Sequence, residues 1–410
     1  MKRFIKFFAL TVGFASLSIL STALLIANEV PNNLSFVEGS KLELNEQLPL
    51  DIDTESSNCL QADEIIKAGK QYVGDVKIFN VIPVKKVNVS VVKETDVIPC
   101  GTAFGVKLYT AGVVVVGMSD VDTANGPKNP ANDAGIKIGD VILAIDGKPV
   151  STNADAEAIF AACDGKSITV SLKRGNVGFQ VKFKPVLSVS TNSYKAGLWV
   201  RDSTAGIGTI TFYEPDSNIF GGLGHGICDV DTGQIMPLMA GDIVKVNITG
   251  IIKGTKGQPG EIQGTLDSNN WGSLSMNTET GVFGILNNDE IGNPIPIAMP
   301  QDIHAGEAKI IATLDSSGPR YYTVQIDRIH FNDNSPTKNM IIKVTDKALL
   351  QKTGGIIQGM SGCPIIQDGK LVGAITHVFV NDPQMGYGIF AENMINTAKT
   401  LENLSQKDVS

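Results

Sequence analysis

The sequence predicts a mainly β protein built from more than one domain. The chain has 410 residues, which is more than one ordinary core organises, so two or three folded units are expected. It contains 43 glycines but only 6% aromatic residues, a balance typical of turn-rich β structure. From residue 193 to residue 405, short apolar runs alternate with glycine and proline turns, which predicts packed β-barrels or a sandwich.

The amino terminus has the pattern of a membrane segment. Lys2, Arg3 and Lys6 precede an uncharged stretch from residue 7 to residue 27. As a helix this stretch would be about 30 Å long, enough to cross a bilayer. Basic residues stay on the cytoplasmic side, so the rest of the chain should be exported. Because Leu25-Ile26-Ala27 is a poor small-x-small cleavage site, residues 1–27 are interpreted as a signal anchor.

Composition excludes several classes of partner and cofactor. The net charge of −8 argues against nucleic acid as a partner. The five cysteines are an odd number with no C-x-x-C pair, so neither a disulfide framework nor a structural zinc site is expected. No nucleotide-binding loop is present, and we expect no metal and no cofactor. The polar residues 28–86 are interpreted as a spacer between the membrane and the first domain.

Residues 87–186 form the first predicted domain. Ala134-Gly135 is suited to end a short helix, and Asp146-Gly147 to make a hairpin turn. An amphipathic helix is expected over 153–163, followed by two alternating strands at 167–173 and 179–183. This segment resembles a PDZ domain.

The PDZ resemblance implies a peptide-binding groove between the helix and a sheet edge. By the same resemblance, Phe104, Gly105 and Val106 match the loop whose backbone N–H groups hold the carboxylate of the peptide. The alternative, a PDZ fold that only packs against its neighbour, stays open.

Chemistry is expected from the segment Gly359-Met360-Ser361-Gly362-Cys363-Pro364. A serine hydroxyl becomes a nucleophile when a tight turn holds it beside a base and backbone N–H groups face the developing oxyanion. Glycines on both sides of Ser361 permit such a turn, although the same residue types also make ordinary hairpin loops.

The base should be one of four histidines. His225 lies in the glycine-rich loop 221–227, which would expose its imidazole. His377, in an apolar strand just after the serine, is the second candidate, whereas His304 and His330 lie among polar residues. For the orienting carboxylate, Asp346 ends an apolar strand before the serine, and Asp315 and Asp327 compete with it.

Over nearly its full length the chain resembles the stage IV sporulation protein B peptidases of endospore-forming bacteria. The resemblance rests on the order of anchor, PDZ domain and peptidase, and on three segments: 196–209, the histidine loop 221–226, and 359–390. It implies Ser361 as nucleophile, His225 as general base and acid, Asp346 as the orienting carboxylate, and the N–H groups of Gly359 and Ser361 as oxyanion donors. The order His, Asp, Ser agrees with trypsin-like enzymes, but a carboxylate so close to the serine does not.

The resemblance also implies a biological setting. In that family the enzyme acts between the two forespore membranes, where it cleaves itself and then a membrane regulatory subunit, which releases an intramembrane protease to process a sigma-factor precursor. The expected partners are therefore protein substrates, including the chain itself, and a PDZ ligand peptide. A non-catalytic PDZ adaptor and a degradative envelope protease remain as alternatives, and a cysteine peptidase that uses Cys363 is a poor one.

Overall fold

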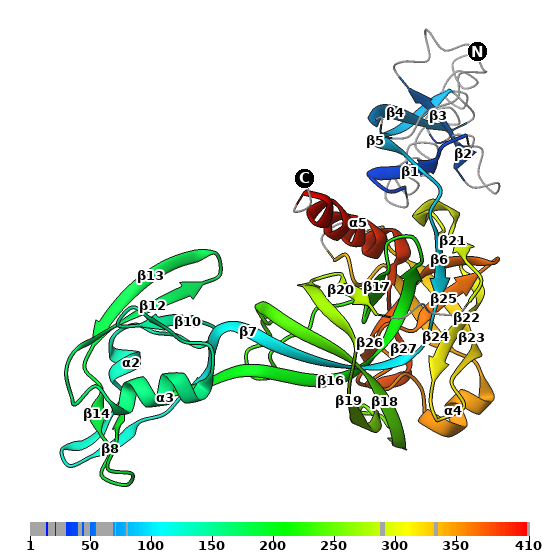
Figure 1. The fold of residues 1–410 in the computed structure, drawn as a ribbon. Coiled ribbons are helices and arrows are strands. Elements are labelled where there is room, and N and C mark those ends of the chain that lie inside the picture. The colour runs from blue at the N-terminus through cyan, green and yellow to red at the C-terminus, as the bar shows by residue number, and fades with distance from the viewer. Residues whose placement is uncertain are drawn as a thin grey trace, which may run out of the picture.

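Strands dominate the computed structural model. It describes residues 14, 21, 30–39, 43–44, 50–54, 69, 71–78, 81–287, 292–331 and 335–407. The predicted membrane segment at 1–27 therefore lies outside the described residues except for Phe14 and Ser21. Within the described part of the chain, no helix has the length and apolar character needed to cross a membrane. Figure 1 shows two lobes at opposite ends of a central body of strands.

The central body contains two closed β-barrels. In the first barrel, neighbouring strands follow the order β7, β18, β19, β20, β17 and β16, and β16 pairs again with β7 to close the ring. The bounds of these strands are β7 Ala103–Met118, β16 Leu198–Glu214, β17 Ile219–Gly222, β18 Leu238–Ile252, β19 Glu261–Thr278 and β20 Gly281–Leu286. This arrangement confirms that the domain of residues 193–405 contains β-barrel structure.

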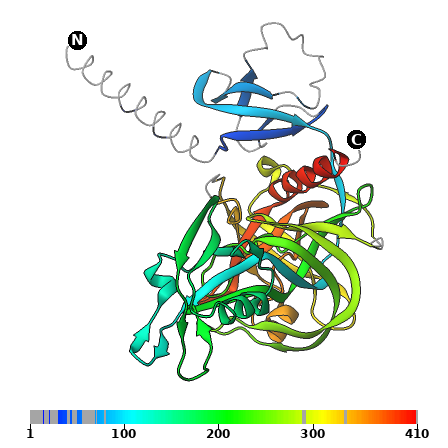
Figure 2. The ribbon, with the colours of Figure 1, turned by 60° about the vertical axis from the view of Figure 1, so that its left-hand side comes forward.

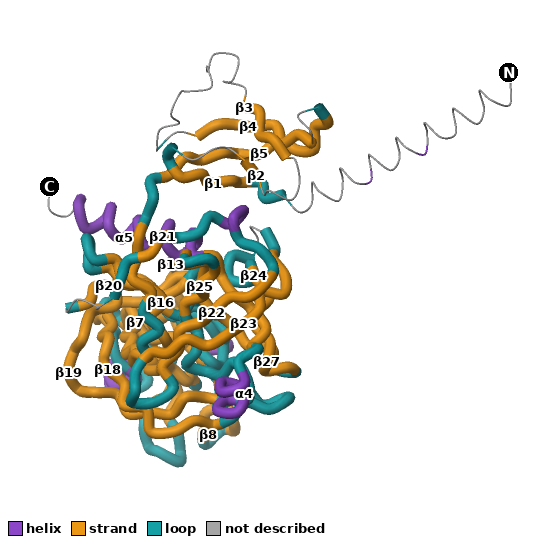
Figure 3. The backbone as a smooth tube through the Cα atoms, turned by 90° about the vertical axis from the view of Figure 1, so that its right-hand side faces the viewer, coloured by secondary structure: helices purple, strands orange, loops and turns teal. Residues whose placement is uncertain are grey.

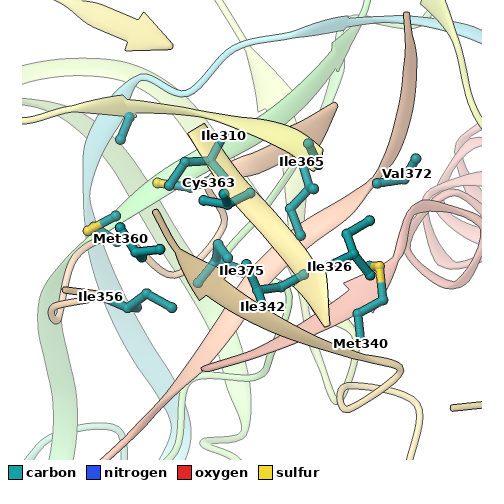
Figure 4. Close-up of a cluster of buried hydrophobic side chains, with 14 of the residues drawn as sticks. Ile310, Ile326, Met340, Ile342, Ile356, Met360, Cys363, Ile365, Val372 and Ile375 are labelled. Atoms are coloured by element: carbon teal, nitrogen blue, oxygen red, sulfur yellow. The ribbon is translucent and has the colours of Figure 1, made fainter. Parts of the chain in front are cut away.

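The second barrel has the order β22, β23, β24, β27, β26 and β25. Its strands are β22 Gly306–Thr313, β23 Pro319–Ile329, β24 Met340–Val344, β25 Pro364–Gln367, β26 Lys370–Phe379 and β27 Asp382–Phe390. Figure 4 shows the aliphatic core that fills it, with Ile310, Ile326, Ile342 and Ile375 turned toward one another. Met360 and Cys363 belong to the same core, so the nucleophile loop is anchored on both sides of Ser361.

The PDZ-like unit lies between β7 and β16 along the chain and is therefore inserted into the first barrel. Strands β7 and β16 leave the barrel together and run into this unit, as Figure 1 shows. Between them lie β8 Val121–Thr123, β9 Gly126–Lys128, α2 Pro130–Asp133, β10 Val141–Ile145, β11 Lys148–Pro149, α3 Asn153–Ala161, β12 Ile168–Arg174, β13 Val177–Phe183, β14 Val186–Leu187 and β15 Tyr194–Lys195. At Gly112 of β7, φ is 92° and a Cβ would lie 2.4 Å from the carbonyl oxygen of Ile142, so glycine is required where the strand passes between the two units.

The segment interpreted as a spacer contains a sheet of its own. Its strands are β1 Asn33–Val37, β2 Glu43–Leu44, β3 Leu50–Thr54, β4 Gln71–Ile78 and β5 Ile82–Val92, in the order β1, β5, β4, β3, β2. Leu34, Phe36, Val76, Val87 and Val89 form its buried core. The spacer prediction was therefore wrong, because alternating strands with one polar face have the same composition as a polar linker. In Figures 2 and 3 this sheet lies above the barrels.

Five short or peripheral elements complete the body. They are β6 Asp96–Pro99, β21 Ile295–Pro296, the 3-10 helix Pro300–Asp302, α4 Lys347–Thr353 and α5 Ala391–Lys407. Helix α5 contributes Met394 and Ile395 to a core shared with Phe212 and Phe283 of the first barrel and Ile389 of the second. The two barrels are therefore joined by buried apolar contacts behind the site.

Candidate active site

Ser361 and His225 line one cleft of about 900 Å³. His225 follows β17 of the first barrel, and Ser361 precedes β25 of the second. Both side chains stand on loops at the junction of the two barrels, as expected for a site built on a rigid scaffold. The two residues that the sequence predicts as nucleophile and base thus line the same cleft, one from each barrel.

The nucleophile loop is a tight turn that needs both of its glycines. Gly359 and Gly362 have φ values of 96° and 95°. A Cβ on Gly362 would lie 2.0 Å from the carbonyl oxygen of Thr209, so no larger residue fits without displacement of the first barrel. The hydroxyl of Ser361 donates to the carbonyl oxygen of Thr376 at 2.8 Å. In this resting state the hydroxyl must rotate before it can donate to an imidazole.

Two buried threonines of β16 hold this loop from the opposite barrel. The hydroxyl of Thr209 donates to the carbonyl oxygen of Gly359 at 2.8 Å, and the hydroxyl of Thr211 donates to that of Gly362 at 2.7 Å. The backbone N–H of Thr209 donates to the carbonyl oxygen of Ser361 at 2.9 Å. Three carbonyl groups of the loop are therefore turned toward β16 and away from the cleft.

The N–H groups of Gly359 and Ser361 are the predicted oxyanion donors. Neither has a hydrogen-bond acceptor among the described residues. Each of the two peptide groups is fixed at its carbonyl end: Gln358 accepts from the N–H of Ile262 at 2.9 Å, and Met360 accepts from the N–H of Cys363 at 3.0 Å. Fixed donors without partners can stabilise a developing oxyanion without reorganisation.

His225 is held as a neutral imidazole. Its Nδ1 lies 2.9 Å from the carbonyl oxygen of Gly226, which accepts a hydrogen bond from the Nδ1–H tautomer and leaves Nε2 as the basic nitrogen. Burial lowers the pKa of His225 below its ordinary value, although the Gly226 carbonyl opposes the shift. A histidine that is neutral at neutral pH can accept the serine proton.

His377, the second candidate base, lies beside His225. The centroids of the two rings are 4.7 Å apart, and His377 follows Thr376, the acceptor of the Ser361 hydroxyl. Desolvation, His225 and the Lys338 ammonium lower the pKa of His377 to about 4. Both histidines are therefore uncharged in the cleft near pH 7.

The carboxylate predicted to orient His225 has a different task in this structure. Asp346 is the N-cap of α4: its side chain accepts from the N–H of Leu349 at 2.9 Å and from that of Thr323 at 3.3 Å. Asp346 does not line the cleft, and no hydrogen bond joins it to His225 within the described chain. The prediction that Asp346 orients His225 was therefore wrong, because the carbonyl oxygen of Gly226, and not a carboxylate, lies against Nδ1 of His225. Of its competitors, Asp315 pairs with Lys352.

The predicted peptide-binding loop at Phe104, Gly105 and Val106 is not a loop. These residues lie inside β7 and pair with β16 on one side and β18 on the other, so their backbone groups belong to the barrel. Phe104 and Val106 are buried in the first barrel core. The assignment failed because the strand continues from the PDZ-like unit into the barrel. Helix α3 instead contacts β15 and the adjoining end of β16.

Thr209, Thr211 and Ile262 are site residues that the sequence did not reveal as such. Thr209 lies in a segment noted only for its resemblance, and its hydrogen bonds span 150 positions of the chain. No local spacing could indicate such a contact. Cys363, in contrast, is excluded as a nucleophile: its thiol is fully buried and burial raises its pKa to about 12.

At the junction of two joined β-barrels lie a serine, a neutral histidine and two N–H donors that have no acceptor within the described chain. These features define a serine peptidase, here with an inserted PDZ-like unit. Comparison with family models agrees: residues 192–395 match the SpoIVB peptidase S55 model, and residues 121–174 match a PDZ domain model. Residues 192–395 therefore form a peptidase domain similar to the SpoIVB peptidase S55 family.

No curated protein matches the chain. Among solved structures, the PDZ domain of the SdrC-like protein from Listeria monocytogenes is 21% identical, covering 22% of this chain and 87% of that chain with a TM-score of 0.18.

Proposed function

We propose that the chain is an exported, membrane-associated and self-cleaving endopeptidase of sporulation. The observation that carries the endopeptidase activity is that Ser361, His225 and Gly359 line one cleft, where the N–H groups of Gly359 and Ser361 have no acceptor among the described residues. The family supports the sporulation setting. Attachment to the forespore membrane through residues 1–27, with the barrels between the two forespore membranes, is part of the proposal.

The geometry supports a two-step acyl transfer. The Ser361 hydroxyl turns from the Thr376 carbonyl to the Nε2 of His225, which takes its proton as the oxygen attacks the peptide carbonyl carbon. The oxyanion binds to the N–H groups of Gly359 and Ser361. His225 then gives the proton to the leaving amine, and a water molecule repeats the sequence to release the acyl group. The Gly226 carbonyl holds the imidazole in the required tautomer throughout.

The proposed substrates are the chain itself and a membrane regulatory protein of an intramembrane protease, whose cleavage starts processing of a sigma-factor precursor. The PDZ-like unit would bind a peptide of such a partner. Because β16 runs from α3 of that unit to Thr209 at the nucleophile loop, a bound partner and the catalytic site would share one strand. This continuity supports a role for the unit in presenting substrates.

Fragmentation of the purified full-length protein tests the proposal. Wild type in detergent is incubated beside Ser361→Ala and His225→Ala, and intact masses are followed over time. We expect fragments from wild type alone, with masses that identify the cleavage sites. Fragments of the same mass from folded Ser361→Ala would show that another nucleophile or a contaminating protease acts. If wild type neither fragments nor cleaves an added unfolded protein, the proposed endopeptidase is refuted.

A further inference from the structure

The cleft around Ser361 and His225 exposes apolar side chains on both of its banks. Val230 and Ile235, which follow His225 in the first barrel, are 84% and 43% exposed. Val380, at the end of β26 in the second barrel, is 51% exposed. Ile227 and Val378 continue the same lining toward the catalytic residues. Apolar side chains that stay exposed on both sides of the catalytic pair indicate that the cleft binds apolar side chains of a substrate.

Full charges are scarce in the cleft. Among the described residues that line it, only Glu279 and Lys338 carry one, and both histidines are neutral near pH 7. A charged substrate side chain in this lining would lose hydration with only Glu279 or Lys338 to pair with. The electrostatics therefore select against charged residues next to the cleaved bond.

The backbone of the cleft is arranged for an extended chain. Residues 204–208 of β16 pair with β7 along one edge, whereas the pairing with β17 on the other edge begins only at Ile210. His377 to Phe379 of β26 likewise lie beyond the pairing with β25, which ends at Ala374. Within the described chain, each bank thus offers an open strand edge to an extended peptide.

One position on these edges leaves unusual space. A Cβ placed on Gly206 would have no heavy atom within 4 Å, although its neighbours pair in the barrel. Gly206 lines the cleft, so this space is open to a substrate side chain. On the opposite bank, the buried Ile356 also lines the cleft.

We propose that the cleft is specific for extended peptide segments that carry uncharged, apolar side chains on both sides of the cleaved bond. Val230 and Ile235 contact the segment from the first barrel, and Val378 and Val380 contact it from the second. This inference rests on the proposed endopeptidase function and adds the substrate class. The natural substrates are therefore apolar strands or unfolded apolar segments rather than charged surface loops.

A peptide library tests the specificity. Full-length protein in detergent cuts a mixture of peptides derived from a denatured proteome, and mass spectrometry identifies the residues on both sides of each cut, with Ser361→Ala as the blank. We expect apolar residues to be enriched on both sides. For matched synthetic peptides, replacing one flanking apolar residue by Lys or Glu should lower kcat/KM at least about tenfold. Cuts without apolar enrichment, or beside charged residues, would overturn the proposal.

Charge variants assign the preference to the named side chains. Val230→Lys and Val380→Lys should each lower cleavage of the apolar peptide by about tenfold or more and raise cleavage of its Glu-substituted form. The control is Val177→Lys, a 67% exposed valine of β13 in the PDZ-like unit, which should cut like wild type. Unchanged preferences in both cleft variants would refute the assignment. If neither wild type nor any variant cuts a peptide, the proposed endopeptidase function is refuted. That outcome is distinct from cleavage without the apolar preference, which refutes only the specificity.

Discussion

The backbone N–H of Thr209 in the first barrel donates to the carbonyl oxygen of Ser361 in the second barrel. The carbonyl oxygen of the same threonine accepts from the N–H of Leu223, two positions before His225. Thr209 therefore connects the nucleophile loop and the histidine loop through its own backbone. The relative position of nucleophile and base is set by one residue of β16, and not only by the packing of the two barrels.

We predict that Thr209→Val lowers kcat more than it raises KM. Valine keeps the shape and the backbone bonds but leaves the buried carbonyl of Gly359 without its donor at 2.8 Å, which costs about 1–3 kcal/mol. The loop that presents the oxyanion donors should then lose its fixed geometry, with a loss of roughly tenfold or more in kcat. Peptide cleavage and urea unfolding measure the two effects. Thr209→Ser, which keeps the hydroxyl, should retain most of the activity, and equal losses in both variants would contradict this role.

Asp346 allows a direct comparison between a structural and a catalytic carboxylate. Because it caps α4, Asp346→Ala should lower the free energy of unfolding by about 1 kcal/mol, whereas Asp346→Asn, also a good N-cap, should change it by much less. We expect Asp346→Asn to fold and cleave peptides within a few-fold of wild type. A folded Asp346→Asn protein that has lost activity by orders of magnitude would return Asp346 to the catalytic triad.

The parts of the site that the sequence predicted are those with local signals. Ser361 and His225 lie in glycine-rich loops whose backbone requirements are visible within a few residues. Asp346 also has a local pattern, but a carboxylate before a short helix has the same sequence whether it caps the helix or orients a histidine. Its assignment needed the hydrogen bonds to Leu349 and Thr323.

The fold, like the site, was predicted where the sequence signal is local and missed where it depends on long-range pairing. Turn chemistry and alternation predicted barrel structure, and a resemblance predicted the PDZ-like unit, but neither predicted the insertion of that unit into the first barrel. The insertion depends on pairs such as Phe104 with Gly208, which are separated by the entire PDZ-like unit. Local propensity carries no information about such pairs. The error at Phe104, Gly105 and Val106 and the missed role of Thr209 both follow from this one long-range pairing.

Gly362→Ala should abolish activity while leaving most of the fold in place. At φ 95° an alanine is strained, and its Cβ would lie 2.0 Å from the Thr209 carbonyl oxygen and 2.5 Å from the Leu223 nitrogen. Either the nucleophile loop or the histidine loop must then move. Circular dichroism and peptide cleavage measure the outcome. Gly369→Ala, at a positive φ of 77° but with no atom within 4 Å of its Cβ, is the matched control and should remain active.

The acid limb of the pH profile of kcat/KM should lie below pH 6.5, the ordinary pKa of a histidine. Because burial lowers the pKa of His225 below 6.5, the imidazole stays neutral, and kcat/KM should stay high, as the pH falls through 6.5. The pH dependence of kcat/KM on one apolar peptide measures this, and an acid limb at or above 6.5 would contradict it.

His225 and His377 should make the stability of the fold sensitive to acid. The folded state has lowered pKa values at His225 and His377, the latter about 4, so below pH 6.5 the unfolded chain binds more protons than the folded one. Stability should therefore fall as the pH is lowered from 6.5 toward 4. Urea unfolding at pH 7 and pH 5 measures the loss, which should be smaller in His377→Gln than in wild type. His304→Gln is the contrasting variant: His304 lies 2.8 Å from Asp368, which raises its pKa, so its removal should cost stability at pH 5.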